Sequence, residues 1–151
     1  MVKNEMKEID PKDTLSYFFQ DNAEHFGISA VFLYGSFARG FPRQDSDLDI
    51  AIVFDEDSDD DSIYRRILDI SFDLSERCGR EVNIIPIYKD FRKPLLYYNA
   101  IIFGIPVYMR NLEDLTFLKL ESLFQMEDFS IFGLEWQLNL VKNNLEVIRH
   151  D

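Results

Sequence analysis

The sequence has little of what several protein classes require. Only one of its 151 residues is cysteine, Cys78, so an internal disulfide framework is excluded. No apolar run approaches the roughly 20 residues that span a bilayer. The opening residues, MVKNEMKEID, have no apolar segment behind their lysines and are not typical of a signal peptide. Together these absences predict a cytoplasmic protein without membrane segments.

Basic residues are also scarce, with 16 Lys and Arg against 28 Asp and Glu, which gives a formal net charge of -12. A chain this acidic repels phosphate backbones, so general binding of duplex nucleic acid is not expected. A nucleotide is not excluded, because a divalent cation can neutralise phosphates locally. Hydrophobic residues make up 46% of the chain and include 14 Phe and 7 Tyr. This supply of large side chains predicts a folded domain with one core.

Periodic patterns predict alternating helices and strands in a single domain. Asp10 and Pro11 are typical of a helix start, and Gly27 is typical of a helix end. Apolar segments bounded by turn residues predict strands over 29–34, 48–54, 82–87 and 107–109. No repeat or linker is present. We therefore expect one domain over residues 1–151, with a core over about 10–110 and a helical C-terminal extension over about 111–151.

The stretch GSFARGFPRQDSDLDIAIVF, residues 35–54, combines two features of phosphoryl-transfer sites. Gly35 and Ser36 follow a predicted strand. Glycine there permits close backbone approach, and N–H groups at a helix start, with the serine hydroxyl, bind phosphate oxygens. After ten intervening residues, Asp47 and Asp49 open the next predicted strand. Because side chains alternate along a strand, both carboxylates point the same way, while Leu48 points into the core.

Two neighbouring carboxylates predict a cation. At about 4 Å their repulsion is ~1 kcal/mol in water and several times larger at a less polar site. Mg²⁺ removes this penalty, and it prefers one or two carboxylates together with substrate phosphates. An Asp-X-Asp pair alone is weak support, because acidic residues at strand starts are often solvated. The whole pattern is far more specific and predicts a metal site that faces a phosphate site.

On these residues the sequence resembles the polymerase-beta-type nucleotidyltransferase superfamily. More narrowly, it resembles the minimal nucleotidyltransferases (MNT), which include antitoxins paired with HEPN-domain ribonuclease toxins. The resemblance covers about residues 28–110, where GSFARG (35–40), DSDLDIAIVF (45–54) and the segment 79–110 follow the family's order and spacing. It implies an α/β (α+β) fold, with a small mixed β-sheet core and helices packed on one face.

The resemblance also implies the roles of single residues. Gly35 and Ser36 would hold the triphosphate of ATP or another NTP, and Asp47 and Asp49 would bind one or two Mg²⁺ ions and carry catalysis. Arg39, within GSFARG, is a candidate phosphate contact, and a solvated arginine is an equally good interpretation.

The sequence departs from the family at the third carboxylate. The family carries it on the following strand, where it helps to activate the attacking hydroxyl, and this chain has Asn83 there. An amide ligates a metal through its oxygen but is a poor general base. Glu81, two residues earlier, would lie on the same strand face, although a solvent-facing strand end is the simpler interpretation. The metal site is thus predicted with Asp47, Asp49 and Asn83, and turnover is left open.

The expected activity is transfer of a nucleoside monophosphate, AMP from ATP, onto an acceptor hydroxyl. The resemblance implies that the acceptor is a tyrosine of a separate HEPN toxin, with this chain as the antitoxin. One alternative is a nucleotide-binding antitoxin that acts by contact alone. Another is a small-molecule nucleotidyltransferase of the antibiotic-modifying type, which the short chain disfavours because it has no separate substrate domain.

The apolar residues between Leu115 and Ile148 fall on more than one helical face. The pattern fits two interpretations equally, a core that covers the sheet and an exposed interface. The interface would join a partner protein or form a homodimer through C-terminal helices.

Overall fold

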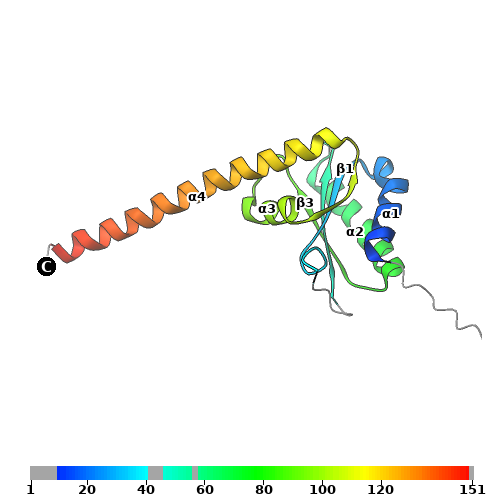
Figure 1. The fold of residues 1–151 in the computed structure, drawn as a ribbon, viewed down its shortest axis with the longest axis horizontal. Coiled ribbons are helices and arrows are strands. Elements are labelled where there is room, and N and C mark those ends of the chain that lie inside the picture. Colours follow the sequence, from blue (N-terminus) through cyan, green and yellow to red (C-terminus); the bar gives the residue numbers. More distant parts are fainter. Residues whose placement is uncertain (1–9, 41–45, 56–57, 150–151) are drawn as a thin grey trace, which may run out of the picture.

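Four strands form one mixed sheet at the centre of the protein (Figure 1). The computed structural model describes residues 10–40, 46–55 and 58–149, with the backbone alone at 129, 131–134, 136–137 and 146–149. The strands are β1 (Ile28–Tyr34), β2 (Leu48–Phe54), β3 (Val82–Ile87) and β4 (Ile105–Met109), in the order β3-β2-β1-β4. β1 pairs antiparallel with β2 and β4, and β2 pairs parallel with β3. The predicted mixed sheet is confirmed. The connection 41–45 lies outside the described residues.

Helices cover both faces of this sheet. α1 (Pro11–Phe26) and α2 (Asp60–Cys78) pack on one face, and α3 (Pro94–Ile102) packs on the other with the start of α4 (Leu112–Arg149). The prediction of helices on one face is therefore wrong. The reason lies in the central strands, where Val31 faces the first core and Phe32 faces the second, both fully buried. Burying such a side chain contributes about 1.5–3 kcal/mol, so each apolar face requires a cover.

Local sequence signals set the ends of α1. The carboxylate of Asp10 accepts a hydrogen bond of 3.1 Å from the backbone N–H of Lys12, and Pro11 occupies the first turn. Gly27 ends the helix in the left-handed region, at a φ of 65°. The predicted start and end of this helix are confirmed, and β1 follows directly.

The C-terminal extension, which the sequence predicts to be helical, is one continuous helix of 38 residues, α4. Its first turns pack against α3, and the remainder extends away from the body (Figure 1). Ser122 is buried on the packed side, and its hydroxyl donates 2.8 Å to the carbonyl of Leu118. No proline interrupts the segment, so nothing breaks the backbone hydrogen-bond ladder. None of the helices in the described ranges combines the length and hydropathy needed to cross a membrane.

Candidate functional site

Three strand ends meet at one edge of the sheet. Tyr34 at the end of β1 is paired with Asp49 near the start of β2, and Asp49 is in register with Asn83 near the start of β3. β1 and β2 are antiparallel, so the end of one meets the start of the other. β2 and β3 are parallel, so their starts meet. The topology therefore brings residues 34, 49 and 83 side by side.

The side chain of Asn83 lies between the two aspartates. Its amide nitrogen is 3.4 Å from Oδ2 of Asp47 and 3.4 Å from Oδ1 of Asp49. These hydrogen bonds are long and weak. Asp47 and Asn83 are exposed and Asp49 is half-buried, so the cluster opens to solvent. A half-turn of the amide would present its oxygen beside the carboxylates, and an all-oxygen set of this kind suits a hard cation such as Mg²⁺. The three residues predicted for the metal site are thus brought together.

Glu81 does not complete a third carboxylate here. It lies just before β3, it is exposed, and its backbone carbonyl accepts 2.9 Å from the N–H of Leu48. Within the described ranges, no three His, Cys, Asp or Glu side chains gather where they could hold a metal. Asp47 and Asp49 therefore have an amide as their third neighbour.

Gly35 fits against the carboxylate of Asp49. Its φ is 75°, in the left-handed region, and a Cβ added at Gly35 would overlap Oδ2 of Asp49. Both the conformation and the close approach require glycine. The glycine of the predicted phosphate site and the aspartate of the predicted metal site are therefore in direct contact.

Residues 35–40 form a turn, where the sequence predicts the start of a helix after Gly35 and Ser36. Backbone N–H groups of Arg39 and Gly40 donate to the carbonyls of Gly35 (3.2 Å) and Phe37 (3.4 Å). Between them, the N–H groups of residues 36–38 donate to no backbone carbonyl in the described part of the chain. Consecutive N–H groups in a turn can form an anion-binding concavity, so the predicted phosphate site would rest on the turn and not on a helix dipole.

A cavity of about 430 Å³ adjoins this turn. Gly35, Ser36 and Arg39 line it from the turn, and Leu96 and Asn99 line it from α3. Its volume is in the range of small-molecule sites. The three predicted triphosphate-binding residues are thus brought to one cavity, with Arg39 exposed. Their roles remain predictions.

Tyr34 also lines this cavity and was not anticipated from the sequence. Burial, with a smaller contribution from the negative charge of Asp49, raises the pKa of Tyr34 to about 12. Its phenol is therefore neutral at physiological pH and can donate a hydrogen bond. Its position directly before Gly35 could have indicated a site residue. Because it ends an apolar strand, however, the sequence pattern suggested that Tyr34 belongs to the core. Leu96 and Asn99 had no comparable signal, because only the tertiary fold brings α3 to the turn.

Arg80 contacts both the turn at residues 35–40 and the residues that precede β2. Its guanidinium carbon lies 5.0 Å from the ring centroid of Phe37 in the turn, and its Nη1 donates 3.3 Å to the carbonyl of Ser46. Ser46 directly precedes Asp47. Arg80 therefore holds the turn and the approach to β2 together, a role that no sequence pattern indicated.

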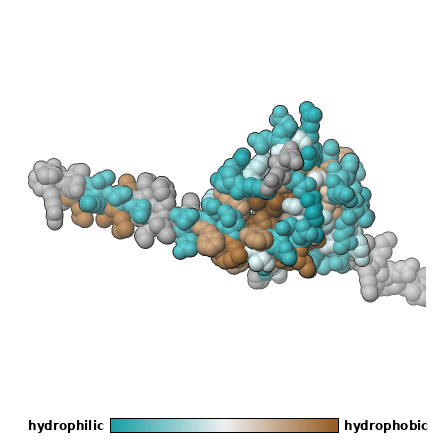
Figure 2. Space-filling model, turned by 90° about the horizontal axis from the view of Figure 1, so that it is seen from above, coloured by the Kyte–Doolittle hydropathy of each residue, from teal (hydrophilic) through white to brown (hydrophobic). Residues whose placement is uncertain are grey.

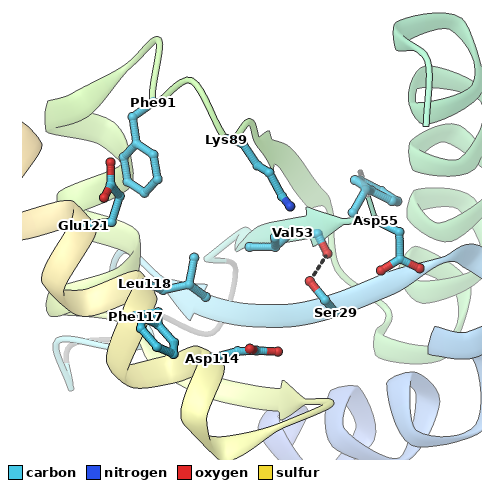
Figure 3. A pocket seen from close by; sticks show the side chains of 10 residues that line it. Ser29, Val53, Asp55, Lys89, Phe91, Asp114, Phe117, Leu118 and Glu121 are labelled. Atoms are coloured by element: carbon cyan, nitrogen blue, oxygen red, sulfur yellow. Dashed lines mark hydrogen bonds between the residues drawn. The ribbon is translucent and has the colours of Figure 1, made fainter. Parts of the chain in front are cut away.

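A second cavity, of about 420 Å³, lies at the opposite ends of β1 and β2 (Figure 3). Lys89 and Phe91 reach toward it from the loop after β3, and Leu118 reaches toward it from α4. The hydroxyl of Ser29 donates 3.2 Å to the carbonyl of Val53 at its floor. None of the predicted site residues lines this cavity, so it is separate from the aspartate site.

A small mixed sheet with two aspartates and a glycine–serine turn at one edge is the arrangement of a nucleotidyltransferase domain. The sequence profile of the family "Polymerase beta, Nucleotidyltransferase" matches residues 14–113, and the chain belongs to this family. No curated protein sequence matches the chain.

Several solved structures share this fold. A crystal structure of a toxin–antitoxin with AMP-PNP has a TM-score of 0.66 at 13% identity and covers 86% of this chain and 98% of its own. The toxin–antitoxin MntA–HepT has a TM-score of 0.61 at 11% identity, with 87% and 97% covered. A complex of a tri-AMPylated Shewanella oneidensis HEPN toxin with its MNT antitoxin has a TM-score of 0.61 at 10% identity, with 86% and 98% covered. At these identities the likeness establishes the fold.

Proposed function

We propose that this chain is an MNT-type nucleotidyltransferase that moves AMP from ATP onto a tyrosine of a separate HEPN-domain protein, and that it acts as that protein's antitoxin. The observation that carries the proposal is the meeting of Asp47, Asp49 and Asn83 beside the Gly35 turn. The partner is suggested by solved structures of the same fold, one of which contains an AMPylated HEPN toxin beside an MNT antitoxin.

In this proposal the turn binds the triphosphate of ATP. The Ser36 hydroxyl and the N–H groups of residues 36–38 donate to phosphate oxygens, and Arg39 at the edge of the cavity neutralises part of their charge. Tyr34 contributes a neutral phenol as a further donor. Together these groups orient the nucleotide so that its α-phosphate lies beside the two aspartates.

Asp47, Asp49 and the amide oxygen of Asn83 would hold Mg²⁺, which when bound would offset the negative charge of the phosphates. The acceptor hydroxyl attacks the α-phosphorus, its oxygen forms the new P–O bond, and the bond to the β-phosphate breaks to release pyrophosphate. Asn83 cannot take the hydroxyl proton, so a carboxylate of the pair must accept it. A tyrosine suits this site, because a phenol with a pKa of about 10 ionises far more readily than an aliphatic alcohol.

The test is co-expression with a HEPN protein, taken as the product of the adjacent gene, followed by the intact mass and peptide map of that protein. We expect a mass increase of whole AMP units located on tyrosine. The increase should vanish with Asp47→Asn/Asp49→Asn and persist with Asp69→Asn/Asp73→Asn, which makes the same charge change on α2. An unmodified HEPN protein beside the wild-type chain contradicts the proposal.

Asn83 favours one alternative, an antitoxin that binds nucleotide and silences its partner by contact alone. This alternative predicts a stable complex, bound ATP and no modified tyrosine. It also predicts that Asp47→Asn/Asp49→Asn still protects cells against the toxin, whereas the enzymatic proposal predicts that protection is lost.

A further inference from the structure

α4 carries two apolar faces, and only one of them is covered. The first face, with Leu115, Leu118 and Ser122, packs toward α3 and the sheet. The second face lies away from Leu115 and Ser122 around the helix, and its large apolar side chains are 45–69% exposed. These are Phe117, which also lines the cavity of Figure 3, Leu120, Leu123, Phe124, Leu138, Val141 and Leu145. Figure 2 shows apolar surface in patches along the part of α4 that leaves the body.

Six of these seven residues follow a seven-residue repeat, and the seventh, Leu123, lies beside it. Phe117, Leu120 and Phe124 are spaced by three and four positions, and so are Leu138, Val141 and Leu145. The second group lies 21 positions after the first, which is three whole heptads, so both belong to one a/d frame. In the sequence the same frame continues through Ile131, Leu134 and Ile148, and its one polar position is Glu127. A heptad repeat sustained over four to five heptads is typical of a coiled coil and not of a helix packed on a globular core.

We propose that a second copy of this chain covers this seam, the a/d positions from 117 to 148, and that the two α4 helices form an antiparallel coiled coil. This inference is independent of the proposed function, because the seam includes no residue of the aspartate site.

The charges beside the seam favour the antiparallel arrangement. The e positions are acidic in the first part, at Glu121, Asp128 and Glu135, and basic at Lys142 and Arg149. In an antiparallel pair the e positions of the two helices face each other, so Glu121 of one helix lies beside Lys142 of the other and Asp114 lies beside Arg149. Asp128 and Glu135 face each other across the middle, so four attractive pairs outweigh two repulsive ones. In a parallel pair e faces g, and the g positions 123, 130, 137 and 144 carry no charge.

The register is also consistent with the length of the helix. Pairing position 117 with position 148 of the second copy places an a residue opposite a d residue in every layer, including 124 opposite 141 and 145 opposite 120. The seam then ends where α4 ends, at Arg149. The basic end of the second helix comes to lie beside Asp114 and Glu121, which line the cavity of Figure 3. Attraction there reinforces the apolar seam.

The first test is the mass of the full chain in solution at micromolar concentration. We expect twice the chain mass of 17.9 kDa for the wild type and 17.9 kDa for Val141→Glu/Leu145→Glu. The control Asn139→Glu/Asn143→Glu adds the same charge to the same exposed turns outside the seam and should remain a dimer. Circular dichroism should show retained helix in both variants. A monomeric wild type, or a control that dissociates like the seam variant, overturns the proposal.

Cross-linking tests the direction of the pair, in a Cys78→Ser background that removes the native thiol. Phe124→Cys and Val141→Cys should each stay uncross-linked alone and form a disulfide-linked dimer when mixed and oxidised. A strong self-cross-link of either variant alone would mean a parallel pair and would overturn the antiparallel arrangement. A different result is that the wild type is monomeric and the seam variants no longer bind the HEPN protein. The seam would then belong to the contact with that partner, and the proposal of a second copy would be wrong.

Discussion

The amide nitrogen of Asn83 lies 3.4 Å from Oδ1 of Asp49, in register on the neighbouring parallel strand. The family resemblance implies a carboxylate at this position. An amide there removes one negative charge from the cluster and donates to both aspartates, so it reduces the repulsion that a cation would otherwise have to offset. It also removes a proton acceptor. Asn83 therefore stabilises the cluster without a cation but cannot act as a base. Substitution at this position tests both effects.

Asn83→Asp should therefore make the fold depend on Mg²⁺. A third carboxylate adds repulsion of about 1 kcal/mol per close pair in water, so the free energy of unfolding should fall in EDTA and recover with Mg²⁺. The transfer rate should rise, by up to on the order of 100-fold, if a proton acceptor is limiting. Urea unfolding with and without Mg²⁺ and single-turnover kinetics measure the two effects. Asn139→Asp, an exposed change on α4, should show neither effect, and an unchanged rate in Asn83→Asp would mean that proton removal does not limit transfer.

Gly35→Ala should abolish nucleotide binding, because its Cβ overlaps the carboxylate of Asp49. Gly79→Ala is the matched control, since Gly79 has a φ of 60° and open space around an added Cβ. Both variants should lose about 1–2 kcal/mol of stability from the left-handed conformation. Only Gly35→Ala should lose ATP affinity, as measured by isothermal titration calorimetry. Equal ATP affinity in the two variants would refute the role of the close approach.

Tyr34 should ionise at a higher pH than an ordinary tyrosine. Its folded pKa, about 12, is above the unfolded value of 10, so its stabilising effect is complete below pH 10 and is lost as the pH rises toward 12. Tyr34→Phe should make the free energy of unfolding less dependent on pH in that interval. Asp49→Asn should lower the pKa of Tyr34 only partly, because burial is the larger cause. Difference absorbance titration of each variant against wild type measures both, and a Tyr34 that ionises near pH 10 would disprove the assignment.

Arg80→Gln should weaken ATP use without unfolding the protein. The variant loses the guanidinium contact with Phe37 and the hydrogen bond to the Ser46 carbonyl, which together hold the turn near the aspartates. We expect KM for ATP to rise several-fold with a smaller change in kcat. Arg77→Gln is the control, because Arg77 stacks on Phe18 at 5.1 Å and pairs with Asp73 at 2.8 Å, away from the site. Equal KM values in the two variants would remove Arg80 from the site.

The strands and turns that carry the site were predictable from the sequence, because each is determined by residues that lie close together in the chain. The apolar run of β2 and the spacing of Asp47 and Asp49 predicted both the strand and the side on which the carboxylates project. The glycine of the turn was predicted for the same reason, and its contact with Asp49 follows from the antiparallel pairing of β1 with β2.

The remainder depended on tertiary contacts that no local pattern reports. α3 contributes Leu96 and Asn99 to the cavity, and Arg80 reaches the turn from the connection between α2 and β3. The family resemblance implies helices on one face, whereas both faces of β1 and β2 carry buried apolar side chains and each face is therefore covered by helices. The helical extension was predicted, but its apolar residues fall on two faces, so the sequence did not show which of them the body covers.

The central claim is that the site around Asp47 and Asp49 transfers the α-phosphate of ATP. The most direct measurement compares α-³²P-ATP with γ-³²P-ATP in separate reactions with Mg²⁺, this chain and the HEPN protein. The account predicts label on the HEPN protein from the α position alone, none from the γ position, and none from either with Asp47→Asn/Asp49→Asn. Label from the γ position, or α label that persists in the double variant, would contradict it.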